Sequence, residues 1–333
     1  MNSTSEQHIN KYYKYKHIYI FLVFVLATLY ALLLSNYIPM DVSIKDRVNY
    51  VDYASSPEVI FVRYWSNGVI SSFFNEPVWL GLNFIFSRFL TPEQVVATII
   101  FFSAFSSAFV ILKINPRYIF FLVFILLFPQ VITKYVVHIR QGFAISLFLL
   151  GWFCQSRSWR WFFFALTPLI HASFFFILFL YAFTHILRDV KLSSDIRTIA
   201  VILFGLTIGV GLGFLAGAVG ARQANVYEFS ASSVSGLGFV LWLCVFTLYY
   251  LQGRTFAKKN AFAMSIIAFY LSTYFLIEVT GRIFESSVVI VLLASLGLTS
   301  WRRLCFFGLI ISFTLITWIL RFKEPWLGWG TGL

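Results

Sequence analysis

The chain has 333 residues, of which 60% are hydrophobic and 11% are charged, and its formal net charge is +12. A soluble domain carries about 25% charged residues, so this composition excludes a soluble globular enzyme and indicates an all-α, polytopic integral membrane protein. The excess charge does not indicate nucleic-acid binding, because the Lys and Arg residues lie in short segments between apolar runs, where they set topology and contact anionic lipids. We expect a single membrane domain over residues 1–333.

Apolar segments of about the 20 residues that one membrane crossing needs recur along the whole chain. They are 17–38, 95–112, 117–133, 136–155, 161–183, 197–219, 237–252, 261–278, 284–299 and 303–320. A shorter segment, 77–90, fits either a tilted span or a helix in the membrane interface. The sequence therefore predicts about 10–11 transmembrane helices.

The N-terminal segment reads as an uncleaved anchor, because no small-residue cleavage site follows its apolar run. Lysines at positions 11, 14 and 16 precede that run, so the positive-inside rule places the N-terminus in the cytoplasm of a bacterial inner membrane protein. The loop 39–76 then faces outward. Its Tyr, Trp and Val content predicts short interfacial helices rather than a solvated linker.

Three further basic turns are predicted to be cytoplasmic, at Arg157/Arg160, at Arg254/Lys258/Lys259 and at Arg302/Arg303. Three apolar segments separate the first turn from the second, although an even number is required. Either one segment does not cross, or one charged loop lies on the other side. Pro168 within 161–183 also allows a broken or re-entrant helix.

The segment 136–183 is the most informative part of the chain. Two apolar runs, VVHIRQGFAISLFLLGWFCQ and WFFFALTPLIHASFFFILFLYAF, flank the basic turn SRSWR. His138, Arg140 and Gln141 lie near the far end of the first run, and His171 and Ser173 lie on the second. An arginine in hydrocarbon costs about 2.5–3.5 kcal/mol. At 1.5 Å per residue both polar groups lie roughly 20–26 Å from the turn, which predicts one outward-facing polar site.

Arg140 is the strongest candidate, because its guanidinium can hold a diphosphate or a carboxylate with two nitrogens at once. The alternative is an arginine that snorkels to lipid phosphate. His171 is a candidate general base or substrate hydrogen-bonding group, and the alternative is a structural histidine.

The outer loop supplies carboxylates and aromatic rings, which sugar recognition and acid–base catalysis require. Asp46 and Glu76 are the candidate carboxylates, with Tyr50 and Tyr53 as neighbouring sugar-binding rings. The alternative is a solvated loop whose acidic residues have no special role.

A third candidate cluster comprises Glu278, Arg282 and Glu285 in LIEVTGRIFESSVVIV. Arg282 and Glu285 are three residues apart and can pair on one helix face. A second arginine on the outer side would complete a phosphate clamp with Arg140. The alternative is an ion pair that holds two helices together.

Several common motifs are absent from the sequence. It contains no GxxxxGKS, GxSxG or HExxH motif. The three cysteines, at 154, 244 and 305, are scattered singly, so neither a disulfide framework nor a zinc site is predicted. These observations argue against an ATP-driven pump and a metalloenzyme.

HIRQGFAISLFLLGWF, the basic turn and the His-Ala-Ser segment after it resemble the EpsG-type branch of the Wzy-like polysaccharide polymerases. DRVNYVDY, NEPVW and GRIFES are similar to its outer-loop and late-helix segments. Many members carry Pro where this chain has Ala172.

The resemblance implies a membrane glycosyltransferase that joins undecaprenyl-diphosphate-linked repeat units into O-antigen or capsule polysaccharide, without a metal or another cofactor. Arg140 and Arg282 would stabilise the leaving diphosphate, and His171, Asp46 or Glu76 would act on the acceptor hydroxyl. Gln141, Ser173, Glu285, Tyr50, Tyr53 and His138 would contact the substrate. Membrane lipids and a chain-length regulator protein are the candidate partners, besides the lipid-linked oligosaccharide itself.

Two other classes remain open. A lipid-linked oligosaccharide flippase or transporter would carry charged residues through the full membrane thickness. A membrane O-acyltransferase would also use a histidine, with a path for a cytoplasmic acyl donor. The depth of Arg140 and His171 relative to a cavity separates these classes from a polymerase.

Overall fold

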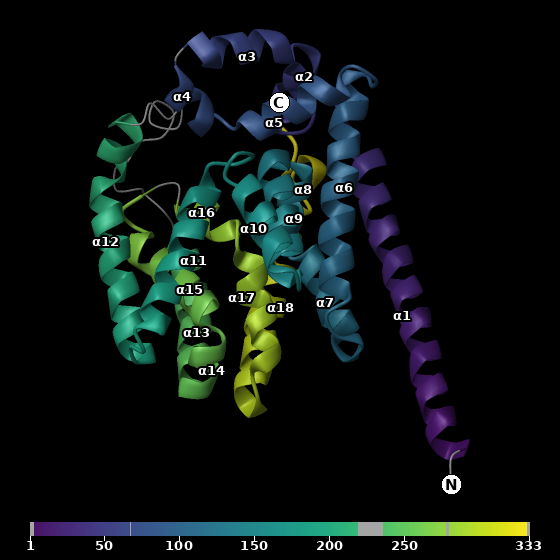
Figure 1. Ribbon diagram of the computed structural model, residues 1–333, viewed down its shortest axis with the longest axis vertical. Helices are drawn as coiled ribbons and strands as arrows, with labels where there is room; N and C mark the ends of the chain where they lie inside the picture. The colour runs from purple at the N-terminus through teal and green to yellow at the C-terminus, as the bar shows by residue number, and fades with distance from the viewer. Residues whose placement is uncertain (1–2, 67, 219–235, 278–279, 332–333) are drawn as a thin grey trace.

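The computed structural model describes residues 3–66, 68–218, 236–277 and 280–331. Within these ranges the chain is helical, and its only bridge between extended segments joins Ile44 to Gly330. The bundle carries a layer of short helices at one end, which we call the loop end; α1 begins at the opposite end (Figure 1). The all-α, polytopic class predicted from composition is confirmed.

The outer loop forms the short helices that were predicted for it. The helices of this layer are α2 (Arg47–Ser55), α3 (Pro57–Ser66), α4 (Val69–Phe74) and α5 (Pro77–Phe86). They lie across the loop end, above the ends of the bundle helices (Figure 1). Buried Tyr50 and Trp79 pack edge to face with ring centroids 5.8 Å apart, which joins α2 to α5.

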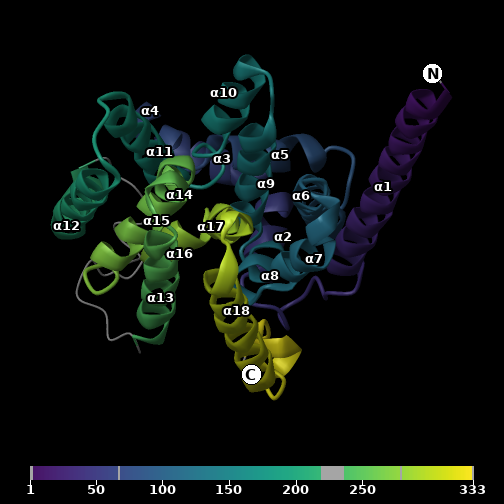
Figure 2. The ribbon, with the colours of Figure 1, turned by 90° about the horizontal axis from the view of Figure 1, so that it is seen from below.

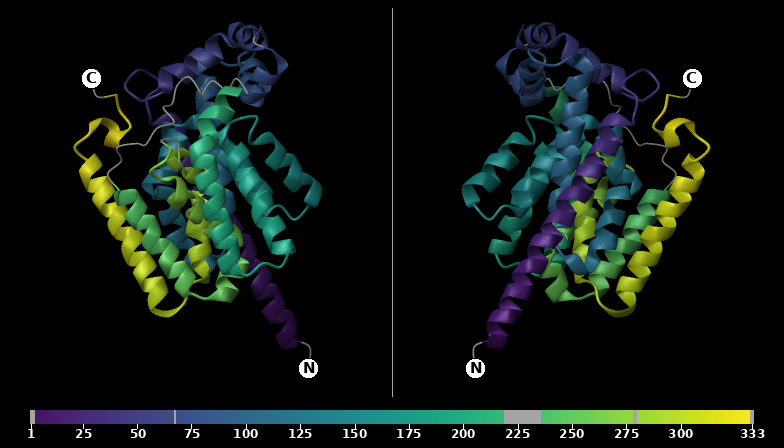
Figure 3. Two further views of the ribbon diagram at one scale, coloured as in Figure 1. Left: turned by 90° about the vertical axis from the view of Figure 1, so that its left-hand side faces the viewer. Right: turned by 90° about the vertical axis from the view of Figure 1, so that its right-hand side faces the viewer.

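Among the described residues, four helices are long and apolar enough to cross a membrane: α1 (Ser3–Asn36), α6 (Pro92–Leu112), α12 (Ser194–Ala218) and α18 (Ser300–Arg321). Helix α6 packs between α1 and α9 (Ile139–Phe153). Its buried face carries Ser and Ala residues, which allow close helix–helix approach in a membrane. Helices α1 and α12 occupy opposite flanks of the bundle (Figure 2), and α18 lies at its outside (Figure 3).

Helices α7 (Ile119–Leu127) and α8 (Pro129–Val136) form a fifth candidate span that bends by 58°. Pro129 causes the bend, because proline lacks a backbone N–H and keeps the preceding residue out of the helical region. Phe128 accordingly has φ −62° and ψ 128°. Helix α8 and the start of α9 therefore meet beneath the outer loop.

The remaining apolar helices of the described chain are shorter than predicted, so length and composition support four or five spans rather than ten or eleven. The shorter helices are α9, α13 (Leu237–Leu251), α15 (Ala261–Thr273) and α17 (Val288–Ala294), with η3 (Ser295–Gly297) after it. The connecting elements are η1 (Pro116–Tyr118), α14 (Arg254–Lys259), α16 (Thr280–Glu285) and η4 (Pro325–Gly328).

Residues 161–183 do not form one continuous span but are broken around Pro168, the alternative that the sequence left open. The segment forms a hairpin of α10 (Arg157–Leu166) and α11 (Ser173–Asp189), in which the rings of Phe164 and Tyr181 lie 5.4 Å apart. Pro168 follows α10 and prevents its continuation. The tip reaches the outer layer, where the Val78 N–H donates to the Leu169 carbonyl at 3.0 Å.

This hairpin bears on the parity problem of the basic turns. Between Arg160 and Lys258 the described residues form the helices α10, α11, α12 and α13, which is an even number. Arg160 and Lys258 line the same cavity, so both turns lie at one end of the molecule. Gln252 at the end of α13 bonds to Arg302 of α18 at 2.8 Å, which places the third basic turn at that end as well.

Candidate functional site at the loop end

Arg140 lies in the first turn of α9 and forms an ion pair with Glu76, with Nη1 and Oε2 2.5 Å apart. The side chains are 19% and 7% exposed. Glu76 precedes Pro77 of α5 and has φ 62°, a left-handed conformation that is uncommon for glutamate. The ion pair therefore fixes an otherwise unfavourable backbone geometry and ties α5 to α9.

The rings of Tyr50 and Tyr53 also contact the guanidinium of Arg140. Its central carbon lies 5.7 Å from the Tyr50 ring centroid and 5.6 Å from that of Tyr53, within the range of cation–π attraction. The Nε atom of Arg140 is buried without a hydrogen-bond partner. Arg140 is thus held beneath α2 in a fixed orientation, with one donor unused.

A chain of hydrogen bonds runs from His171 to α16. His171 Nδ1 lies 2.8 Å from Ser173 Oγ, which lies 2.7 Å from Ser286 Oγ. Gln141 Nε2 donates to Ser286 Oγ and to the Arg282 carbonyl, at 2.7 Å each. Three parts of the chain that are far apart in sequence therefore meet in one buried polar network.

Asp46 and His138 form a second pair at this end, with Oδ2 and Nδ1 3.5 Å apart. Their side chains are 48% and 28% exposed. The hydrogen bond from His138 lowers the pKa of Asp46, and the charges of His138, Arg282 and Arg140 lower it further. Asp46 is therefore ionised at neutral pH, and its carboxylate interacts electrostatically with Arg282 and Arg140.

Glu285 forms an ion pair with Lys134 of α8, which joins α16 to α8. The Lys134 side chain is 2% exposed and that of Glu285 is 23% exposed. This contact matches the alternative considered for the third cluster, an ion pair that holds two helices together. Arg282 itself is exposed, and Glu278 lies outside the described residues.

The predicted site residues that the structure describes lie together at the loop end, in or next to α2, α5, α9, α11 and α16. Their chemical roles stay predictions. Two residues of the cluster, Lys134 and Ser286, were not predicted. Lys134 could have been found, because it is a charged residue at the end of an apolar run. Ser286 carries no such signal, because it is one of many serines in the chain.

The sequence comparisons agree with this geometry. No curated protein and no solved structure matches the chain. A family match covers residues 39–325 and thus contains the outer layer, Arg140, the His171 network and α16. The chain belongs to the EpsG family, the family of Wzy-like polysaccharide polymerases.

Proposed function

We propose that this protein polymerises oligosaccharide repeat units carried on a polyprenyl diphosphate such as undecaprenyl diphosphate, at the outer face of the bacterial inner membrane. Family membership supports a polysaccharide polymerase-like function in a membrane protein. The loop end would face outward, with the N-terminus in the cytoplasm, because the basic turns gather at the opposite end. The growing glycan would leave one carrier as its diphosphate departs, and its reducing-end sugar would join the next unit.

The observation that supports this proposal best is the position of Arg140. A departing diphosphate gains negative charge, which a fixed cation stabilises most effectively when water is largely excluded. Glu76, Tyr50 and Tyr53 fix the guanidinium, while its Nε–H has no hydrogen-bond partner among the described residues. Arg282, which influences the same Asp46 carboxylate, would supply the second positive charge.

Both histidines are engaged at Nδ1, but His171 Nδ1 faces a backbone N–H donor whereas His138 Nδ1 faces a carboxylate, and this separates their proposed roles. The Ser173 backbone N–H donates to His171 Nδ1 at 3.3 Å. A neutral His171 must then carry its proton on Nε2, where it can donate a hydrogen bond to substrate. His171 is therefore better suited to orient a sugar or phosphate oxygen than to act as the base at Nε2.

His138 has the opposite arrangement. Its Nδ1 faces the ionised Asp46, so a neutral His138 keeps its proton on Nδ1 and leaves Nε2 as an acceptor. A carboxylate that orients a histidine and stabilises its protonated form is a recurrent arrangement for general base catalysis. We therefore propose that His138 Nε2 is the general base that accepts the proton of the acceptor hydroxyl. Asp46 is the residue that positions His138, and Glu76 is the partner of Arg140.

The test uses purified protein with lipid-diphosphate-linked repeat units, and the readout is a ladder of elongated glycans. His138→Gln, which cannot accept the proton as a base, should remove the ladder. His171→Gln keeps an N–H donor and should retain part of the activity. Equal loss from both variants, at equal abundance, would contradict the division of roles.

The same assay separates a polymerase from a transporter. In sealed proteoliposomes, movement of lipid-linked units across the bilayer without any ladder would favour the flippase alternative. Transfer of an acyl group from a soluble donor without glycan elongation would favour the acyltransferase. A ladder that forms with substrate only on the loop-end side supports the polymerase.

A further inference from the structure

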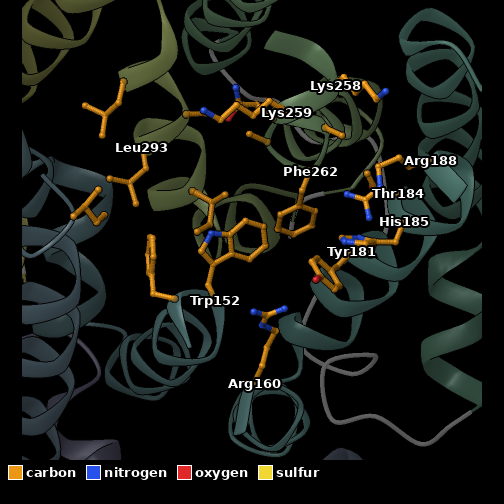
Figure 4. A pocket seen from close by; sticks show the side chains of 18 of the residues that line it. Trp152, Arg160, Tyr181, Thr184, His185, Arg188, Lys258, Lys259, Phe262 and Leu293 are labelled. Carbon is orange, nitrogen blue, oxygen red and sulfur yellow. The ribbon is translucent and has the colours of Figure 1, made fainter. Parts of the chain in front are cut away.

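A second polar feature lies far from the Arg140 cluster, at the end of the bundle where the basic turns gather. It is a cavity of about 480 Å³ between the end of α9, the hairpin α10–α11, α14 and the start of α15. Two arginines and two lysines, Arg160, Arg188, Lys258 and Lys259, line it together with His185 (Figure 4). Among the described residues that line the cavity, no aspartate or glutamate occurs.

The remaining walls of the cavity are apolar and largely aromatic. Trp152, Tyr181 and Phe262 lie between the basic side chains (Figure 4). The Trp152 and Phe262 rings stack with centroids 5.3 Å apart, and Tyr181 packs edge to face against both. Leu293 and Ile290 of α17 close the apolar side. The cavity therefore combines a cationic rim with an apolar interior.

The basic residues are only partly neutralised by the protein. Arg160 donates through Nη2 to the Cys154 carbonyl at 2.8 Å, but its Nε is buried without a partner. Arg188 has a weak contact with Asp189, at 3.8 Å between largely exposed side chains. Such a rim attracts a multiply charged anion more strongly than a neutral polar group.

We infer that this cavity binds the phosphate headgroup of an anionic phospholipid, with Arg160, Lys258 and Lys259 around the phosphate and the acyl chains along the aromatic wall. A phosphate attached to apolar chains matches both parts of the cavity, whereas a free anion uses only the rim. Basic pockets between membrane helices on the cytoplasmic side are suited to such headgroups. The bound lipid would hold the α10–α11 hairpin against α14.

The experiment measures the melting temperature of the full-length protein in neutral detergent, titrated with phosphatidylglycerol, with phosphatidylcholine of the same chains, or with inorganic phosphate. Phosphatidylglycerol should raise the melting temperature, and the other two should not. Lys258→Gln and Lys259→Gln should each weaken the apparent affinity about fivefold, the effect of one basic residue near a lipid phosphate. Arg160→Gln should act in the same direction.

Arg254→Gln is the matched control. Arg254 begins the same helix and carries the same charge, but its side chain is 87% exposed, contacts Asp195 at 3.8 Å and does not line the cavity. This variant should bind phosphatidylglycerol like the unchanged protein. If Arg254→Gln weakens the affinity for phosphatidylglycerol equally, the effect comes from diffuse surface charge. If inorganic phosphate stabilises the protein equally, the cavity is a site for free anions. Either result overturns the proposal. Because the readout is lipid binding, it is independent of glycan polymerisation.

Discussion

At the scale of single residues, the ion pair with Glu76 fixes the position of Arg140 but leaves its Nε–H donor without a hydrogen bond among the described residues. Glu76 contacts one guanidinium nitrogen, and two tyrosine rings lie close to the guanidinium carbon. An interfacial arginine that only anchors a helix needs no such surroundings. The geometry therefore favours a ligand-binding role for Arg140.

Replacing Arg140 by alanine should abolish chain elongation, with at least about a hundredfold loss of rate, because a preorganised cation next to the leaving group is removed. Arg140→Lys should restore only part of the activity, since an ammonium offers a point charge in place of a planar fork. The measurement is the surface-polysaccharide ladder in polymerase-deficient cells, with membrane abundance as control. Full activity of Arg140→Lys would contradict the proposal that two guanidinium nitrogens contact the diphosphate.

Asp46 gives a prediction for pH dependence. Because its pKa is lowered by His138, its contribution to the free energy of unfolding is fully present above its ordinary pKa of about 3.9 and is lost as pH falls through the lowered value. Asp46→Asn should therefore lower the melting temperature by a constant amount between pH 6 and 8. That difference should shrink below about pH 4. A difference that grows on acidification would contradict this assignment.

At the scale of helices, the close packing of α8 on α9 determines where the site residues lie. A Cβ atom added at Gly142 would overlap the Lys134 carbonyl group and would lie 3.2 Å from the Tyr135 ring. Only glycine allows the two helices to approach this closely. Lys134 belongs to α8 and Arg140 to α9, so the spacing of the two helices sets the separation of these side chains.

Gly142→Ala should push α8 away from α9 and destabilise the protein by about 1–3 kcal/mol, the usual range for overpacking. Activity should fall as well, although no polar side chain is altered. Gly308→Ala is the control, because a Cβ at that helical position meets no atom within 4 Å. The melting temperature and glycan ladder of the two variants check the prediction, and equal behaviour would contradict it.

At the scale of the whole molecule, the C-terminal segment fastens the outer layer to the bundle. The Lys45 N–H donates to the Trp329 carbonyl at 2.9 Å, and the Thr331 N–H donates to the Ser43 carbonyl at 3.0 Å. The Trp329 indole N–H donates to Thr133 of α8 at 3.1 Å. The last residues of the chain thus hold the start of the outer loop next to the helix that carries Lys134.

Truncation after Arg321 should loosen residues 39–76, since these hydrogen bonds contribute about 1 kcal/mol each. In vesicles with the loop end outward, proteolysis within the loop should accelerate at least about tenfold, because local opening becomes easier. Trp329→Phe, which removes one donor only, should cause a smaller increase. An unchanged cleavage rate in the truncated protein would show that the C-terminal segment does not stabilise the outer loop.

The sequence by itself determined the class of protein and the helical outer layer, and it supplied most residues of the candidate site as predictions. Burying so many apolar residues with so few charges requires membrane helices, and polar residues within apolar runs are costly enough to mark a site. Arg140 and His171 were selected for this reason, whereas Glu76 was selected as a carboxylate of the outer loop. Proline at 168 allowed a broken or re-entrant helix as one description of 161–183.

Only the tertiary structure decided how these residues combine. Glu285 pairs with Lys134, a partner that helical spacing could not predict because it lies 151 residues away in the sequence. Ring-nitrogen roles depend on neighbours such as Ser173 and Asp46, which no local pattern reveals. The basic cavity is lined by segments that lie far apart in the sequence, so only their packing in three dimensions brings the basic residues together.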